Sequence, residues 1–427
     1  MVNENALILK GNIVYAKEDK SLQCMPDGYV VCVENRCRGV YARLPEKYAM
    51  LPVRDYGTAM ILPGMTDLHV HASQYTFRGI GMDLELLEWL GHNTFPEEAK
   101  YKDLVYAKSA YQIFVEDMRR SFTTRACIFA TLHKEATIEL MDQLEASGLI
   151  TFVGKVNMDR NGTVDLCEPS AKEAALATRD WLTRIRGRYL RTYPILTPRF
   201  IPSCTDELML ELQKIQREYG LHVQSHLSEN LSEVAWVKEL VPAAPSYAGA
   251  YDMFGLLGSK LMPAIMAHCV YCTKDERSLM KQRGVYVAHC PESNLNLASG
   301  IAPIRRYLED EIPVGLGTDI AAGSSISMAK AITLSIQASK MYYRLIDTTA
   351  KPLNVTEAFY LATLGGGSFF GKAGTFLDDY EFDAVVVDDS KIKSMRKLTL
   401  EERLERLFYQ ESECRLIDKY VCGTRIG

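Results

Sequence analysis

The chain has 427 residues, of which 47% are hydrophobic and 24% are charged, and its formal net charge is −5. This composition is typical of a globular protein with a large core and excludes an intrinsically disordered chain. No block of like charge is long enough to form a nucleic-acid or membrane surface, so we expect neither partner. The length predicts two domains or one large barrel with an appendage.

The start of the chain and the cysteine count both predict a cytoplasmic protein. The start of the chain lacks the basic region and apolar run of a secretory signal, and no apolar stretch is long enough to span a bilayer. Eleven cysteines are scattered through the chain, an odd number that favours reduced thiols in the cytoplasm over a disulfide framework. Cys269 and Cys272 have the C-x-x-C spacing, but without a second pair we interpret them as buried thiols.

Strand-like segments open the chain. They are ALILKGNIVYA, GYVVCVENRCRGVYA and AMILPG, and polar turns separate them. This pattern predicts a small antiparallel β unit over residues 1–62.

After Pro63, short apolar runs alternate with amphipathic helical stretches, which is typical of βα units around a parallel sheet. Between the fourth and fifth runs, for example, a helix is expected to begin at Thr205 and to end at Gly220, because capping residues flank leucines at helical spacing. The runs predict eight strands, over residues 65–72, 123–133, 149–158, 190–200, 221–229, 264–271, 284–294 and 312–323.

Eight such strands fit an α/β fold of the (β/α)8, TIM-like barrel type over residues 63–374. A doubly wound open sheet is the alternative, but no G-x-G-x-x-G follows the first strand. The segment GKAGTFLDDYEFDAVVVDDS returns to turn and strand composition near the end of the chain. We therefore expect residues 375–427 to join residues 1–62 in one composite β-sandwich domain.

Histidines recur where the predicted barrel strands end. His69 and His71 follow Asp67 and point to the same face of an extended strand, since side chains alternate there. In a barrel, functional groups gather at the carboxyl ends of the strands. The polar residues expected at that rim are His69, His71, His226, His268, His289 and Asp319.

Imidazoles and a carboxylate in this number suit a first-row divalent ion such as zinc or iron. A bound ion could lower the pKa of water from 15.7 to roughly 7, so hydrolysis becomes the leading reaction class. An isolated H-x-H could instead be an exposed pair that titrates freely. The later residues at the same rim favour the metal site.

The remaining rim residues have alternative roles. Glu229, three residues after His226, could shuttle protons or merely face a helix dipole. Asp319 could bind metal and act as general base, although alone in a glycine-rich loop it would be a turn residue. His268 could be a ligand or could orient the water. His289 could support the site or be a core histidine.

The motifs PGMTDLHVHA, QSHLSEN, MAHC, AHCPESN and GLGTD together resemble the amidohydrolase superfamily, in its mononuclear-metal aminohydrolase branch. Within that branch, HASQYTFRGIGMDLELLEWLGHNTFPEE, FATLH, FVGKVNMDRN and TPRF resemble segments of the guanine deaminase family. The resemblance covers essentially the whole chain. It implies a metal-dependent enzyme that converts guanine and water to xanthine and ammonia, and a homodimer.

The resemblance also implies roles for residues of this sequence. One divalent ion, zinc or alternatively iron, is implied at His69, His71, His226 and Asp319. The implied catalytic residues are Glu229 as proton shuttle, Asp319 as general base, and His268 as the group that orients the water. Contacts with the purine are implied for Gln74, Arg199, Phe200, His226 and Glu229.

Two alternatives stay open. HCPESNLNLASG also resembles related deaminases of methylthioadenosine or S-adenosylhomocysteine, and triazine hydrolases share the metal set. The C-terminal β segment also looks short for the family. A remoter alternative is a non-catalytic scaffold with the same fold, which the complete set of ligand positions disfavours.

Overall fold

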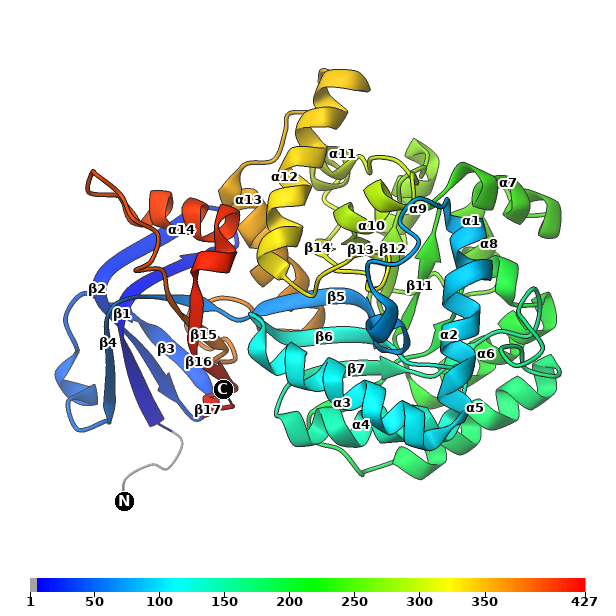
Figure 1. The fold of residues 1–427 in the computed structure, drawn as a ribbon, viewed down its shortest axis with the longest axis horizontal. Helices are drawn as coiled ribbons and strands as arrows, with labels where there is room; N and C mark the ends of the chain where they lie inside the picture. Colours follow the sequence, from blue (N-terminus) through cyan, green and yellow to red (C-terminus); the bar gives the residue numbers. More distant parts are fainter. Residues whose placement is uncertain (1–5, 427) are drawn as a thin grey trace.

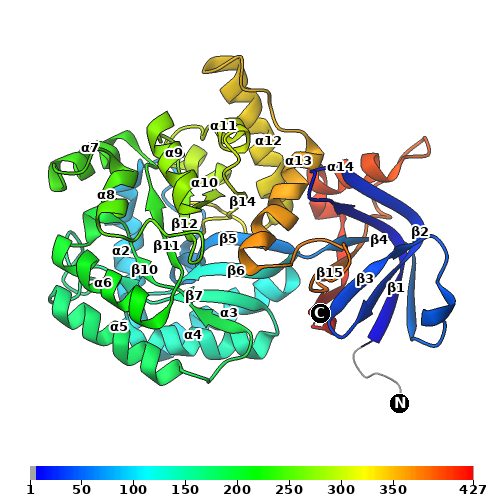
Figure 2. The same cartoon turned by 180° about the vertical axis from the view of Figure 1, so that it is seen from behind.

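A computed structural model describes residues 6–426. It consists of a β sheet on one side and a barrel surrounded by helices on the other (Figure 1). Seen from behind, the sheet carries strands from both ends of the chain (Figure 2). The predicted fold class, a barrel with a β unit built from both termini, is confirmed.

The terminal sheet has seven strands in the order β17-β16-β15-β4-β1-β2-β3. The C-terminal β15 pairs with β4, so that Ala384 lies opposite Pro63. A division of the chain at residues 62 and 375 stays a prediction, since β4 itself runs on to Pro63. The strands are β1 (Ala6–Ala16), β2 (Leu22–Val33), β3 (Arg36–Tyr41), β4 (Val53–Pro63), β15 (Ala384–Asp388), β16 (Arg415–Val421) and β17 (Thr424–Arg425).

The sheet differs from the sequence prediction in two ways. β1 and β4 pair in parallel, because the connection after β3 carries the chain back before β4 begins. A helix, α14 (Leu400–Tyr409), also lies in the C-terminal segment, where only turns and strands were expected. Its signal was present in the sequence: Thr399 and Glu402 form a capping box, and Leu404 and Leu407 are buried at helical spacing.

All eight predicted barrel strands are present, although shorter than predicted. They form two parallel four-stranded sheets, β5-β6-β7-β9 and β11-β12-β13-β14. Their bounds are β5 (Met65–His71), β6 (Thr123–Phe129), β7 (Ile150–Gly154), β9 (Thr192–Pro194), β11 (Val223–Leu227), β12 (Ala264–His268), β13 (Tyr286–His289) and β14 (Val314–Leu316). The short strands β8 (Val156–Asn157) and β10 (Thr197–Pro198) pair beside them.

Backbone hydrogen bonds join the two half-barrels at both seams. At one seam the amide of Gln224 donates to the carbonyl of Leu196 at 2.9 Å. At the other, the amide of Asp319 donates to the carbonyl of His69 at 2.8 Å. The second seam therefore brings the first and the last barrel strands together at two of the predicted site residues.

Helices cover the outside of the barrel (Figure 1). The predicted helix before the fifth strand is α6, where Thr205 caps the first turn and Gly220 ends the helix at a φ of 65°. The helices are α1 (Leu86–Trp89), α2 (Phe95–Ala99), α3 (Leu104–Arg120), α4 (Lys134–Ser147), α5 (Ala171–Ile185), α6 (Asp206–Tyr219), α7 (Leu231–Leu240), α8 (Tyr247–Met253), α9 (Lys274–Arg283), α10 (Pro291–Asn296), α11 (Ile304–Glu309), α12 (Met328–Leu345) and α13 (Val355–Tyr360). Across residues 6–426, no helix combines the length and the apolar character that a membrane crossing requires.

A buried ion pair fastens the barrel to the terminal sheet. Arg125 on β6 donates to Asp383 at 2.6 Å and to Glu381 at 2.7 Å, and the side chains of Arg125 and Asp383 are only 2% and 1% exposed. Such a pair adds little net stability when intact, but removing one partner leaves the other charge buried and unpaired.

We therefore expect Arg125→Ala to lower the free energy of unfolding by about 3 to 5 kcal/mol. Urea unfolding followed by circular dichroism would measure the change. Arg188→Ala serves as the control, because Arg188 pairs with Asp142 at the surface and its side chain is 44% exposed. Equal, small effects of both substitutions would contradict the expectation.

Candidate active site

The predicted rim residues lie close together at the carboxyl ends of the barrel strands. His69 and His71 belong to β5, whose side chains are buried throughout. The others come from neighbouring strands or the loops that follow them. These are His226 on β11, His268 at the end of β12, His289 at the end of β13 and Asp319 just after β14.

Nitrogen and oxygen atoms converge at the centre of this group. The Nε2 atom of His71 lies 3.2 Å from the Nε2 atoms of both His69 and His226. Oδ1 of Asp319 lies 3.1 Å from Nε2 of His69 and 3.5 Å from Nε2 of His71. Four groups of this kind at tetrahedral positions around an ion, with bonds of 2.0–2.1 Å, would be roughly 3.3 Å apart. The spacing thus fits a divalent cation.

Backbone and side-chain partners orient two of the imidazoles. Nδ1 of His226 donates to the carbonyl of Arg199 at 2.6 Å, which leaves its Nε2 lone pair directed at the cluster. Nδ1 of His268 lies 2.9 Å from Oδ1 of Asn294. Nε2 of His268 faces Oε2 of Glu229 at 3.2 Å and Oδ2 of Asp319 at 3.7 Å. His268 therefore stands between the two carboxylates.

Asp67 holds the barrel seam beneath the cluster. Its carboxylate accepts from the amide of His69 at 3.2 Å and from the amide and hydroxyl of Thr318 at 3.1 and 2.5 Å. Burial raises the pKa of Asp67 to about 6. The acid that precedes the H-x-H motif in the sequence thus ties β5 to the loop that carries Asp319.

Burial also sets the protonation of the cluster. It lowers the pKa of His71 and of His226 well below the ordinary value, and neighbouring His69 lowers both further. Burial raises the pKa of Asp319, but the combined effects of His69, His268 and His71 outweigh burial and lower that pKa well below its ordinary range. Neutral imidazoles and an ionised carboxylate are the forms that bind metal.

Glu229 is a buried carboxyl group beside the cluster. The hydroxyl of Ser299 donates to its Oε1 at 3.1 Å, and its other oxygen faces His268. Burial raises the pKa of Glu229 well above its ordinary value, and the charges of Asp319 and Glu233 raise it further. A carboxyl group whose pKa is raised in this way holds its proton more tightly and can act as a general acid.

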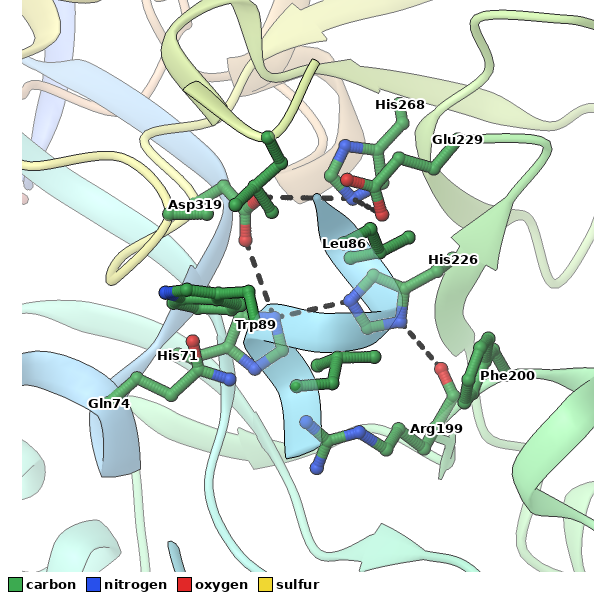
Figure 3. A pocket seen from close by; sticks show the side chains of 13 residues that line it. His71, Gln74, Leu86, Trp89, Arg199, Phe200, His226, Glu229, His268 and Asp319 are labelled. Atoms are coloured by element: carbon green, nitrogen blue, oxygen red, sulfur yellow. Dashed lines mark hydrogen bonds and ion pairs between the residues drawn. The ribbon is translucent and has the colours of Figure 1, made fainter. Parts of the chain in front are cut away.

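A pocket with about 410 Å³ of empty space, part of it open to solvent, lies beside these groups (Figure 3). Its polar lining includes Gln74 and Arg199 as well as Glu229 and His268. The ring of Phe200 lies 6.3 Å from that of His226. Of the residues predicted to bind metal, substrate or protons, all line this pocket except His69, which lies in the cluster beside it.

Sequence reasoning missed the apolar walls. Leu86, Trp89 and Leu90 line one side of the pocket, and Leu297 and Ala322 also contribute. The spacing of Leu86, Trp89 and Leu90 is that of one helix face, so the periodicity of LELLEWLG was a usable signal.

The other histidines lie outside the pocket lining. His289 is buried with no hydrogen-bond partner for Nδ1 among the described residues, and burial lowers its pKa to about 3. His222 contacts the carbonyl of Pro263 through Nδ1, and His92 contacts the carbonyl of Glu88.

Known proteins resemble this chain over its whole length. The amidohydrolase family model matches residues 60–424. A guanine deaminase of Dictyostelium discoideum is 35% identical over 100% of both chains, and one of Homo sapiens is 40% identical over 86% of this chain and 82% of its own. The crystal structure of guanine deaminase from C. acetobutylicum with guanine bound in its active site is 44% identical, covers 99% of this chain and 100% of its own, and superposes with a TM-score of 0.95. The chain therefore belongs to the amidohydrolase family and, within it, to the guanine deaminases.

Proposed function

We propose that this chain hydrolyses guanine to xanthine and ammonia with one divalent ion, zinc or iron, held by His69, His71, His226 and Asp319. The observation that carries the proposal is the joint presence of a cation-sized cluster of ligand atoms and purine-binding side chains in one pocket. The similarity to a guanine deaminase with bound guanine supports the same substrate.

The ligand set fits such an ion. Three imidazole nitrogens and one carboxylate oxygen lie at mutual distances close to those around a tetrahedral or slightly expanded centre. When bound, the ion would lower the pKa of a water molecule and supply a hydroxide nucleophile at neutral pH.

The residues of this chain would then handle the protons. Asp319 accepts the proton that the attacking water loses, and His268 donates or accepts a hydrogen bond that orients this water. Attack at C2 of guanine breaks the ring double bond to N3, and Glu229 protonates N3. The proton on Asp319 passes to the amine, the C2–N2 bond breaks and ammonia leaves. The hydroxyl on C2 then gives its proton back to Glu229, so that the C2 carbonyl of xanthine forms and Glu229 regains its starting state.

The far side of the pocket recognises the base. Arg199 offers N–H donors to O6 of guanine, and the amide of Gln74 can bond to the neighbouring N1–H. Phe200 and the walls formed by Leu86 and Trp89 provide apolar surface for the flat ring.

Ammonia release from a panel of substrates tests this function. Protein loaded with zinc or iron should release ammonia from guanine with a kcat/KM at least about 100-fold above that for adenine, cytosine or methylthioadenosine. The reason is that Arg199 and Gln74 match the O6 and N1–H groups of guanine. Release mainly from methylthioadenosine would favour a nucleoside deaminase. No release from guanine, with metal content verified, would reject the proposal.

We also infer a cytoplasmic homodimer. All eleven cysteines lie in the described part of the chain and none of them forms a disulfide, which suits a reducing compartment. The dimer rests on the family resemblance.

A further inference from the structure

Glu98 lies behind the pocket and contacts two of its lining residues. It belongs to α2, and only 1% of its surface is exposed. Its Oε2 accepts from Nη1 of Arg199 at 2.6 Å, and its Oε1 accepts from Nη2 of Arg199 at 3.2 Å. The same Oε1 accepts from Nε2 of Gln74 at 2.7 Å. One carboxylate therefore holds both side chains.

This contact selects one orientation of the Gln74 amide. A carboxylate only accepts hydrogen bonds, so the nitrogen of the amide must face Glu98. On the other side, the backbone amide of Ala321 donates to Oε1 of Gln74 at 3.0 Å. With both ends of the amide fixed, the second lone pair of Oε1 and the second hydrogen of Nε2 have defined directions.

Arg199 is held in a similar way. Its guanidinium makes a two-pronged contact with Glu98 and lies 5.1 Å from the centre of the Phe95 ring, which belongs to the same helix. A planar fork held at two points keeps its remaining N–H groups in a fixed direction. A buried arginine without this partner would be an unpaired charge with several side-chain conformations.

Glu98 also connects two parts of the pocket. Helix α2 follows α1 closely in the chain, and α1 contributes Leu86 and Trp89 to the pocket wall. Gln74 lies shortly after β5, and Arg199 directly follows β10. Glu98 thus joins helix α2 to the residues that follow β5 and β10, at the end of the pocket opposite Glu229.

We propose that Glu98 is a positioning residue for base recognition, which fixes Arg199 and Gln74 so that together they distinguish the O6 and N1–H edge of guanine. The inference rests on the proposed function. Glu98 does not line the pocket, so it acts through these two residues rather than on the base itself.

The test compares two substrates of the metal-loaded full chain. 2-Aminopurine has the reacting amine on C2 but lacks O6 and the N1–H group. In Glu98→Gln, the kcat/KM for guanine should fall at least about tenfold, because a charge-assisted contact is lost. The kcat/KM for 2-aminopurine should change less than about threefold. If 2-aminopurine turns over too slowly, its inhibition constant against guanine gives the same comparison.

Two further variants separate positioning from folding. Glu98→Asp keeps the charge and should recover part of the guanine preference, and it carries the test if Glu98→Gln does not fold. Asp383→Asn is the matched control, since Asp383 is an equally buried acid paired with Arg125 where the barrel meets the terminal sheet. It should leave the ratio of the two substrates unchanged.

The outcomes distinguish this inference from the proposed function. The positioning role would be overturned if the ratio of kcat/KM for guanine to that for 2-aminopurine stayed unchanged in folded Glu98 variants. It would also be overturned if this ratio changed equally in Asp383→Asn. A wild-type protein that releases no ammonia from guanine would instead reject the proposed function.

Discussion

Glu229→Gln should lower kcat for guanine by about 10² to 10⁴-fold, the usual contribution of a general acid or base, and leave the metal content unchanged. Glutamine has the shape of glutamate and can still accept the hydrogen bond from Ser299, which lies 3.1 Å away. It has no carboxyl proton to give to N3 of guanine. The defect should therefore appear in kcat rather than in KM.

Steady-state kinetics and metal analysis of the purified variant measure this effect. Glu276→Gln is a suitable control, because Glu276 is also buried but accepts from the amides of Thr273 and Ala248 at the start of α9 and α8. The control should keep wild-type kcat. If Glu229→Gln retained more than about a tenth of the activity, the proton shuttle would have to be another group.

The sequence predicted the barrel well because its signals are local. Each strand is a short apolar run between helical stretches, and helix caps such as Thr205 and Gly220 act within a few residues. The parallel pairing of β1 with β4 was not predictable in this way, since it depends on the path of the connection between β3 and β4. The helix α14 had a local signal that was overlooked.

The candidate site shows the same difference between local signals and contacts that are distant in the sequence. Residues at strand ends, such as His226 and Asp319, could be assigned to one rim from topology alone. Glu98 could not, because its partners lie 24 and 101 positions away and nothing near it in the sequence marks a buried acid. The seam contact of Asp67 with Thr318 spans 251 positions and was equally hidden.

The backbone at the site is a further feature that the sequence did not predict. His268, Cys269 and Asp319 have φ values of 71°, 51° and 47°, in the left-handed region that non-glycine residues rarely adopt. Each of these conformations costs about 1 to 3 kcal/mol and persists where the surroundings hold it in place. At Asp319 the surroundings include the seam hydrogen bond to His69.

This conformation makes Asp319→Asn a better probe than alanine. Asparagine tolerates the left-handed region and keeps the shape of the side chain, so the backbone near the seam should be preserved. Its amide nitrogen can neither bind a cation nor accept a proton. We expect kcat for guanine to fall by about 10³-fold or more even with excess zinc, since both a ligand and the general base are changed.

Metal analysis of this variant then separates the two roles of Asp319. The remaining imidazoles of His69, His71 and His226 still converge within 3.2 Å contacts, so the variant should bind the ion more weakly but reach full occupancy at high concentration. Activity that stays low at full occupancy identifies Asp319 as the base as well as a ligand, whereas activity that recovers with occupancy leaves it only the ligand role. Asp347→Asn, which changes an acid paired with Arg306 at the end of α12, should alter neither quantity. Wild-type activity in Asp319→Asn would contradict both roles at once.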